Sequence, residues 1–179
     1  MPIAVSLRAE NHDAWPLRAL WDGASAFEAT PSMQALGYAP HLTLGLYADI
    51  AASEIRAAAK RLFAKATAVE LRFKAVRWFD GPPLVLYAAP EPSSALDGLH
   101  GALHRLIAPE HCHPNYRQGR FVPHCTLAMQ VIPEQRADAI AFAEHTRISL
   151  GATFATGDIV AFPPVRVLAQ WRLRAAHAS

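Results

Sequence analysis

The sequence has few cysteines, no long apolar run and no glycine cluster, and each of these absences excludes a class of protein. Only two of its 179 residues are cysteines, Cys112 and Cys125, which excludes the disulfide framework of a small secreted domain. No apolar run reaches the length of about 20 residues that spans a membrane. Gly151 and Gly157 stand alone, without the clustered glycines of a phosphate-binding loop. Residues 1–12 show no basic leader or cleavage site, so we expect a cytoplasmic protein.

Charge is also nearly balanced. The 17 basic and 15 acidic residues leave a net charge of +2, which is too weak to predict a general nucleic-acid-binding surface. The basic residues are mostly arginine, which suits bidentate contacts to phosphate, although a coding bias towards arginine explains most of them equally well. With 52% hydrophobic residues the chain can form a well-packed core. We expect a single domain over residues 1–179.

One short phrase occurs twice. Residues 38–45 read Tyr-Ala-Pro-His-Leu-Thr-Leu-Gly and residues 121–128 read Phe-Val-Pro-His-Cys-Thr-Leu-Ala, so the copies start 83 residues apart. In each copy a histidine precedes a threonine by two positions. Residues i and i+2 of a β-strand point to the same face, and proline is tolerated at the start of a strand. Each copy is therefore predicted to present an imidazole beside a hydroxyl, with Leu42 and Cys125 on the opposite face.

This pair of side chains suits acid-base chemistry on a phosphodiester. Histidine titrates near neutral pH and can donate or accept a proton. Two histidines on opposite sides of a phosphorus could serve as base and acid, while threonine hydroxyls donate to the non-bridging oxygens. The candidate catalytic residues are therefore His41, Thr43, His124 and Thr126. A single His-x-Thr is ordinary β-strand content, and it is the repetition that favours a function.

The predicted helices and strands follow the same order around both copies. A helix precedes each copy, and a helix, a strand, a turn and a strand follow it. This parallel predicts an α+β fold built from a duplicated unit, with two lobes that meet near residue 90. Ser53 and either Ser93 or Ser94 are candidate helix N-caps. Strands are expected at about 3–8, 41–47, 68–78, 84–88, 124–130, 149–161 and 165–173, and helices at about 14–28, 53–63, 93–107 and 133–145.

The phrases Pro-His-Leu-Thr-Leu-Gly and Pro-His-Cys-Thr-Leu-Ala resemble the two signature motifs of the two-histidine phosphoesterase superfamily. That superfamily includes the proteins called 2′-5′ RNA ligases and the plant-type cyclic phosphodiesterases, and the chain is similar to it over nearly its whole length. The resemblance implies two similar lobes, each an antiparallel sheet backed by helices, with the motifs at the floor of a central cleft. It also implies metal-independent chemistry on 2′,3′-cyclic phosphates or related phosphodiesters, and we expect no cofactor.

Five further residues near the motifs are candidates for substrate binding. Tyr38 and Phe121 each precede a motif histidine by three residues and could stack on a base or a ribose, with core packing as the alternative. Arg117 and Arg120 lie just before the second motif, together with Tyr116. Either arginine could hold a phosphate or a nucleotide tail, or could be a solvated loop residue.

A second group of histidines offers a metal site as an alternative. His100 and His104 are four residues apart on a predicted helix, a spacing that can bind a metal, and residues 111–113, His-Cys-His, could add ligands. Gly101 stands where the zinc-protease pattern needs glutamate. We therefore expect these histidines to be surface residues, and we expect no metal site.

These observations lead to three alternative functions. We expect a monomeric hydrolase of 2′,3′-cyclic nucleotides or of RNA ends that carry such a phosphate, with His124 as base and His41 as acid. A 2′-5′ RNA ligase needs the same four residues, so the motifs do not separate the two activities. The third interpretation is a non-catalytic nucleotide-binding module on the same fold. No protein partner and no membrane association are expected.

Overall fold

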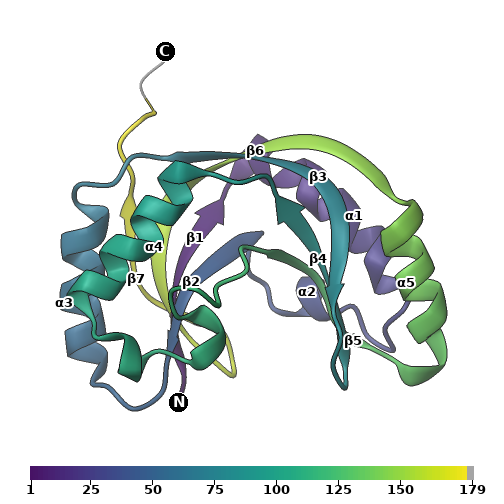
Figure 1. Ribbon diagram of the computed structural model, residues 1–179, viewed down its shortest axis with the longest axis horizontal. Helices are drawn as coiled ribbons and strands as arrows, with labels where there is room; N and C mark the ends of the chain where they lie inside the picture. The colour runs from purple at the N-terminus through teal and green to yellow at the C-terminus, as the bar shows by residue number, and fades with distance from the viewer. Residues whose placement is uncertain (177–179) are drawn as a thin grey trace.

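The computed structural model describes residues 1–176, and one antiparallel sheet forms its centre. Six strands pair in the order β2-β1-β6-β3-β4-β5, and β7 pairs with β6. Helices cover the outer sides of this sheet (Figure 1), so the α+β fold predicted from the sequence is confirmed. The strands are β1 (Ile3–Ala9), β2 (His41–Tyr47), β3 (Val69–Phe79), β4 (Leu84–Pro90), β5 (Cys125–Val131), β6 (Arg147–Ala161) and β7 (Arg166–Arg172).

The strand order is symmetric about its central pair. Outward from β6 and β3, the next strands are β1 and β4, and the last are β2 and β5, which carry the two motifs. The sheet curves into an arch, and β2 and β5 lie against each other on its inner side (Figure 1). The duplication inferred from element order is thus visible in the sheet, and the curvature brings the two motifs together.

Two pairs of helices lie on opposite outer sides of the arch (Figure 1). On one side α3 (Ala52–Phe63) and α4 (Ser94–Leu106) pack together and contact the strands β1, β2, β6 and β7. On the other side α1 (Trp15–Ser25) and α5 (Arg136–His145) contact β3, β4 and β5, with the short α2 (Ser32–Ala35) beside β5. None of these helices within residues 1–176 is long and apolar enough to cross a membrane.

The two sides of the arch do not correspond to the two halves of the sequence. α1 comes from the first half and packs on β5, whereas α4 comes from the second half and packs on β2. The meeting of the two lobes near residue 90 therefore stays a prediction, and each side of the arch includes a helix from the other half of the sequence. The apolar face of each motif strand is covered by a helix from the other half, so both halves are needed to bury either motif.

Of the two helix N-caps predicted from serine positions, one is confirmed and the other is wrong. The Ser93 hydroxyl accepts a hydrogen bond from the Leu96 amide at 3.3 Å and caps α4, as predicted. Ser53 does not cap α3, because that helix starts one residue earlier and Ala51 occupies the N-cap position. The polar segment 108–120 contains two short 3₁₀ turns, at Pro109–His111 and Pro114–Tyr116.

A close approach between α3 and β6 fixes one side of the core. Gly157 lies on β6, and the fully buried ring of Phe63 lies directly against it. A Cβ atom at position 157 would stand 2.5 Å from Phe63 Cδ1, which is far inside van der Waals contact. Glycine is therefore required here by packing, because the Phe63 ring occupies the space a side chain would need.

Gly157→Ala should destabilise the protein by about 1–3 kcal/mol, because the inserted methyl group overpacks the core against Phe63. The matched control is Gly151→Ala on the same strand, where the nearest atom to the new Cβ is the Leu71 carbonyl oxygen at an ordinary 3.8 Å. Urea or thermal unfolding of both variants measures the difference. Equal stability of the two variants would contradict this account of the α3–β6 contact.

Candidate active site

The first motif strand alternates between the core and the inner side of the arch. In β2, Leu42 and Leu44 are fully buried, whereas His41 and Thr43 are only half-buried. The Thr43 hydroxyl lies 3.4 Å from the hydroxyl of Ser6 on the neighbouring strand β1. The histidine and the threonine therefore share the face that the strand pattern predicted.

The second motif strand repeats this alternation. Cys125 and Leu127 are fully buried and Thr126 is half-buried, while His124 lies one residue before β5 begins. Burial raises the pKa of Cys125 to about 12, so this thiol stays protonated and serves as a small apolar core residue. Both motifs thus direct an imidazole and a hydroxyl to the inner side of the arch.

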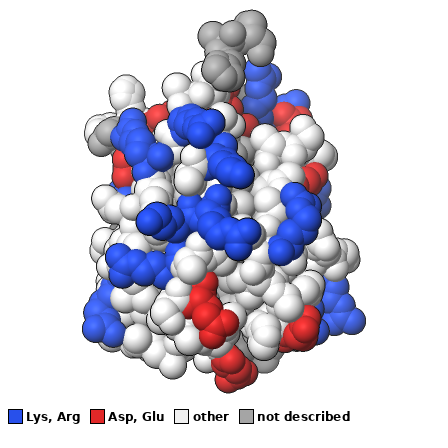
Figure 2. Space-filling view, turned by 90° about the vertical axis from the view of Figure 1, so that its left-hand side faces the viewer, with Lys and Arg blue, Asp and Glu red and all other residues white. Residues whose placement is uncertain are grey.

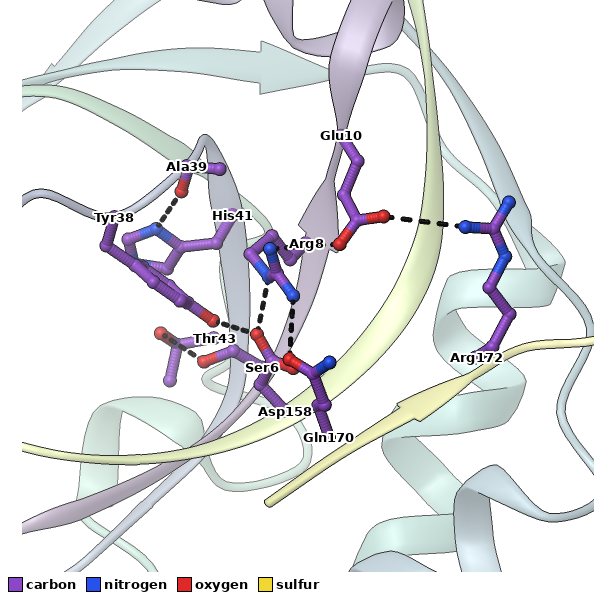
Figure 3. A network of polar contacts seen from close by, with 10 residues as sticks. All are labelled: Ser6, Arg8, Glu10, Tyr38, Ala39, His41, Thr43, Asp158, Gln170 and Arg172. Carbon is purple, nitrogen blue, oxygen red and sulfur yellow. Dashed lines mark hydrogen bonds and ion pairs between the residues drawn. The ribbon is translucent and has the colours of Figure 1, made fainter. Parts of the chain in front are cut away.

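Each motif imidazole is anchored by the backbone carbonyl two residues before it. The Nδ1 atom of His41 lies 3.0 Å from the Ala39 carbonyl oxygen (Figure 3), and the Nδ1 atom of His124 lies 2.7 Å from the Val122 carbonyl oxygen. A carbonyl only accepts hydrogen bonds, so Nδ1 carries the proton in both rings. The Nε2 atom of each neutral imidazole is then an unprotonated base.

Burial keeps both imidazoles neutral in the free protein. It is the largest cause that lowers the pKa of His41 to about 4; the Ala39 carbonyl opposes this shift, and the nearby His124 adds to it. Burial also lowers the pKa of His124, against the opposing effect of the Val122 carbonyl. Because β2 and β5 are also in contact, the two motifs belong to a single site.

A buried carboxylate organises the surroundings of His41. The Asp158 side chain is fully buried, and its Oδ2 atom accepts hydrogen bonds from the Tyr38 hydroxyl and from Arg8 Nε, both at 2.6 Å (Figure 3). The Tyr38 ring lies against the His41 ring with centroids 4.8 Å apart. Because burial and Asp158 raise the pKa of Tyr38 well above its usual value, the hydroxyl keeps its proton and remains a donor. Asp158 therefore positions His41 through Tyr38.

Arg8 is held by further polar contacts on the same face. Its Nη1 atom lies 2.9 Å from Glu10, and its Nη2 atom donates to Gln170 at 3.3 Å. Glu10 in turn lies 3.6 Å from Arg172 of β7 (Figure 3). These contacts fix the guanidinium that balances the buried charge of Asp158, since an unpaired carboxylate would be costly to bury.

The surroundings of His124 are aromatic instead. Its ring meets those of Phe79, Tyr87 and Tyr116 at centroid distances of 5.0, 5.7 and 6.2 Å. Phe79 and Tyr87 stack on each other at 4.3 Å. The same backbone anchor therefore holds an imidazole beside a charged network in one motif and beside apolar rings in the other.

The strand that carries Thr126 is fixed from α1 and from the loop that follows it. Trp21 Nε1 donates to the Thr126 carbonyl oxygen at 3.0 Å. One carboxylate oxygen of Glu28 accepts from the Met129 and Gln130 amides, at 2.9 and 2.8 Å, and the other accepts from the Ser32 amide at 2.9 Å. The Glu28 carboxylate thus takes the place of a neighbouring strand for two amides of β5, the last strand of the sheet, and these hydrogen bonds hold β5 in place.

The structure places the two predicted aromatic stacking residues differently. Tyr38 is 7% exposed, with its ring against His41 and its hydroxyl on Asp158, so it packs inside, which was the alternative to stacking on a base. Phe121 is half-buried and stacks on His100 at 4.0 Å, and its ring centroid also lies 6.4 Å from that of Tyr116. Tyr116 is brought directly beside His124.

The two predicted phosphate-binding arginines have other surroundings. The Arg117 guanidinium donates to the carbonyl oxygens of Cys112 and Glu110 at 2.9 and 3.1 Å, so it braces its own loop. The Arg120 side chain is exposed. No contact found in residues 1–176 joins either guanidinium to His124, and substrate binding by these arginines stays a prediction.

His100 and His104 are buried, which corrects the expectation that they lie on the surface, whereas His111 and His113 are exposed as expected. His100 and His104 are 5% and 6% exposed, and their Nε2 atoms lie 2.7 and 2.9 Å from the Tyr116 carbonyl oxygen. They fasten the loop that leads to the second motif onto α4. Within residues 1–176 no group of three or more histidine, cysteine or acidic side chains is arranged to hold a metal.

Sequence reasoning missed Arg8, Asp158, Phe79 and Tyr87. Asp158 carried a usable signal, because it is a lone carboxylate in the apolar strand β6, and such a residue needs a partner. The aromatic pair carried none, since Phe79 and Tyr87 also fit an ordinary strand pattern. Their meeting with His124 depends on the pairing of β3, β4 and β5.

The chain belongs to the 2′-5′ RNA ligase superfamily, whose family model matches residues 16–155. This range contains both motifs, and the resemblance to the two-histidine phosphoesterases is thereby confirmed. Arg8 and Asp158 lie outside the matched range. The polar contacts around them are therefore seen in the structure and not in the family match. A search of curated proteins found no significant match.

Solved structures share the fold at low sequence identity. The protein TT0787 of Thermus thermophilus is 20% identical with a TM-score of 0.68, and the match covers 99% of this chain and 100% of that one. LigT of E. coli in complex with 3′-AMP is 14% identical with a TM-score of 0.62, over 97% of this chain and 99% of that one. At these identities the likeness shows that the architecture is the same.

Acidification should destabilise the folded protein through His41. Its pKa is about 4 in the folded chain against 6.5 for the ordinary side chain, so between these values the unfolded state binds more protons and the free energy of unfolding decreases as the pH falls. The shift corresponds to about 3 kcal/mol, lost by about pH 4. Urea unfolding of the wild type and of His41→Asn, from pH 7 to pH 4, should show the steeper loss in the wild type. Parallel curves would contradict the burial of a neutral His41.

Proposed function

We propose that the protein is a metal-independent hydrolase of 2′,3′-cyclic phosphates on nucleotides or RNA ends. The observation that carries this proposal is the pair of identically anchored imidazoles, each with a free Nε2 atom and each two residues from a threonine on the same face. E. coli LigT, which shares the fold, has been crystallised with 3′-AMP and with phosphate. These ligands support a nucleotide phosphate as the group the site takes.

The chemistry follows from two imidazoles on opposite sides of the phosphorus. One imidazole takes a proton from water, the water oxygen forms a bond to phosphorus, and the bond from phosphorus to the ribose 3′ oxygen breaks. The other imidazole gives its proton to that oxygen, which leaves a 2′-phosphate. The hydroxyls of Thr43 and Thr126 donate to the non-bridging oxygens, where negative charge accumulates.

The different surroundings of the two imidazoles support a division of roles. Burial lowers the pKa of His41 overall, but the Asp158 carboxylate favours its protonated form, so we propose His41 as the acid in hydrolysis. His124 is enclosed by aromatic rings, and its burial favours the neutral base against the opposing effect of the Val122 carbonyl. The roles exchange in the reverse direction of the reaction.

Removing either imidazole should lower kcat for 2′,3′-cyclic nucleotides by about 10²–10⁴-fold, the usual contribution of general acid-base catalysis. His41→Ala and His124→Ala test this in initial-rate assays across the four common bases. Thr43→Val and Thr126→Val should each cost about a hundredfold. The matched control is His145→Ala, because His145 is an exposed histidine on α5.

Three outcomes separate the alternatives. Retention of the wild-type rate by either motif-histidine variant would sink the proposed mechanism. Nucleotide binding by the wild type with no turnover at any pH from about 5 to 8 would favour the non-catalytic module. Joining of RNA ends without hydrolysis would favour the ligase.

RNA end joining is the second candidate, and a basic surface favours it. Basic side chains gather on the outer face formed by α3 and α4 (Figure 2). A groove of about 740 Å³ there is lined by Lys60, Arg61 and Lys65 of α3 and the turn after it, and by Arg105 of α4. No ion pair within residues 1–176 involves these four side chains. Their charges are free to neutralise phosphates of an RNA strand, a local concentration that the net charge of +2 concealed.

Replacing three of these cations by glutamate, Lys60→Glu, Lys65→Glu and Arg105→Glu together, should weaken RNA binding far more than it slows mononucleotide hydrolysis. Loss of three phosphate contacts lowers the slope of log K against log salt concentration by about 2 to 3. Binding of a short single-stranded RNA at several salt concentrations measures that slope.

The matched control carries the same charge change on exposed arginines outside the groove: Arg72→Glu, Arg147→Glu and Arg166→Glu. An equal fall of the salt slope in both triple variants would show that net charge alone is responsible, and would remove the structural support for the second candidate.

A further inference from the structure

Trp15 is the most exposed large hydrophobic side chain in residues 1–176. It is 74% accessible, although it begins helix α1, whose residues Leu17 and Trp21 are fully buried in the core. A single exposed hydrophobic residue is ordinary, so its exposure alone assigns nothing. What distinguishes Trp15 is the hollow that it borders.

The hollow has a volume of about 430 Å³, within the roughly 300–1,000 Å³ of small-ligand sites. Trp15 and Arg18, one helical turn apart, form the side supplied by α1. Arg8 and Glu10 line it from the end of β1, and Ala39 lines it from the segment that enters the first motif strand. An indole face, two guanidinium groups and one carboxylate therefore surround the same space.

This hollow adjoins the first motif histidine. Arg8 and His41 are direct partners in the pairing of β1 with β2. The Ala39 carbonyl is the acceptor that anchors the His41 ring. A molecule that reaches from His41 along the face of β1 therefore enters the hollow directly.

The two arginines in the hollow differ in how far they are engaged. Arg8 is bonded to Asp158, Glu10 and Gln170. Arg18 forms no ion pair within residues 1–176, and its guanidinium lies 5.2 Å from the ring centroid of Trp21. The Trp21 indole also bonds to the Thr126 carbonyl oxygen of β5. Arg18 is therefore a cation held next to a residue that contacts β5, in a hollow that Ala39, just before β2, also lines.

We propose that this hollow is a second nucleotide subsite, an inference that rests on the proposed function. It holds the nucleotide next to the one whose 2′,3′-cyclic phosphate reacts, with the base on the indole of Trp15 and the linking phosphate at Arg18. Aromatic rings stack on any base, and a guanidinium binds phosphate through paired hydrogen bonds. The favoured substrates are then RNA ends of two or more nucleotides, in preference to free cyclic mononucleotides.

The test compares a mononucleotide with a dinucleotide. The substrates are adenosine 2′,3′-cyclic phosphate and the dinucleotide ApA that ends in the same cyclic phosphate. Trp15→Ala should raise KM for the dinucleotide by about 5- to 150-fold, the range for loss of one stacked base, with a far smaller change for the mononucleotide. Trp15→Phe should restore dinucleotide KM to within a few-fold of the wild type, because phenylalanine keeps a stacking face.

Arg18→Ala should also raise the dinucleotide KM and reduce its dependence on salt. The matched control is Arg147→Ala, an exposed arginine at the start of β6 without an ion pair in the part of the chain that the structure describes. Thermal unfolding of each variant establishes that it is folded. A Trp15→Ala variant that treats both substrates as the wild type does would overturn the subsite.

A binding measurement separates the failure of the subsite from the failure of the proposed function. Wild type and Trp15→Ala are titrated with the uncleaved ligands 3′-AMP and ApA 3′-phosphate by calorimetry. Tighter binding of the dinucleotide that depends on Trp15 supports the subsite even if no cyclic phosphate is hydrolysed. Equal affinities of the two ligands in both proteins would refute the subsite, whatever the hydrolysis assay shows.

Discussion

The candidate site depends on one hydrogen bond made twice, from the Nδ1 atom of a motif histidine to the carbonyl two residues before it. The residue between is Pro40 or Pro123, whose ring fixes its own φ angle and restricts the residue before it. The carbonyl that receives the imidazole proton is thereby oriented by local chain geometry. The repeated Pro-His pair thus fixes which ring nitrogen of each histidine is free for chemistry. The rest of the fold only needs to bring the two histidines to the same side of the sheet.

The surroundings then make two equivalent anchors unequal. A charged network from β1, β6 and β7 reaches His41 through Tyr38, while rings from β3 and β4 enclose His124. A symmetric pair of imidazoles could not distinguish a base from an acid in the resting protein. The duplicated fold brings the two histidines to the same side of the sheet. Residues outside the repeated phrase, such as Asp158 and Phe79, give the two imidazoles different surroundings.

The sequence predicted well whatever is local and periodic. Strand alternation placed His41 and Thr43 on one face and Cys125 in the core, and the Ser93 cap was readable from its position. Contacts between distant segments were not readable: Arg8 meets Asp158 across 150 positions, and Trp21 meets Thr126 across 105. The first contact follows from the pairing of β1 with β6, and the second follows from the packing of α1 on β5. Both depend on packing of the whole chain. For the same reason the sequence left open whether Tyr38 stacks on a base or packs inside.

The symmetric strand order has a mechanical consequence. β2 and β5 stand at opposite ends of a path of five strand pairings, and each pairing rotates the next strand by roughly 20–25°. The rotations add to roughly 100–125°, and register irregularities in the pairings bend the strands further. Together they turn the two ends of the path towards each other. The gap between the motif imidazoles is therefore an elastic property of the whole sheet, and its width is set as much by β3 and β6, the strands farthest from it along this path, as by the strands that border it.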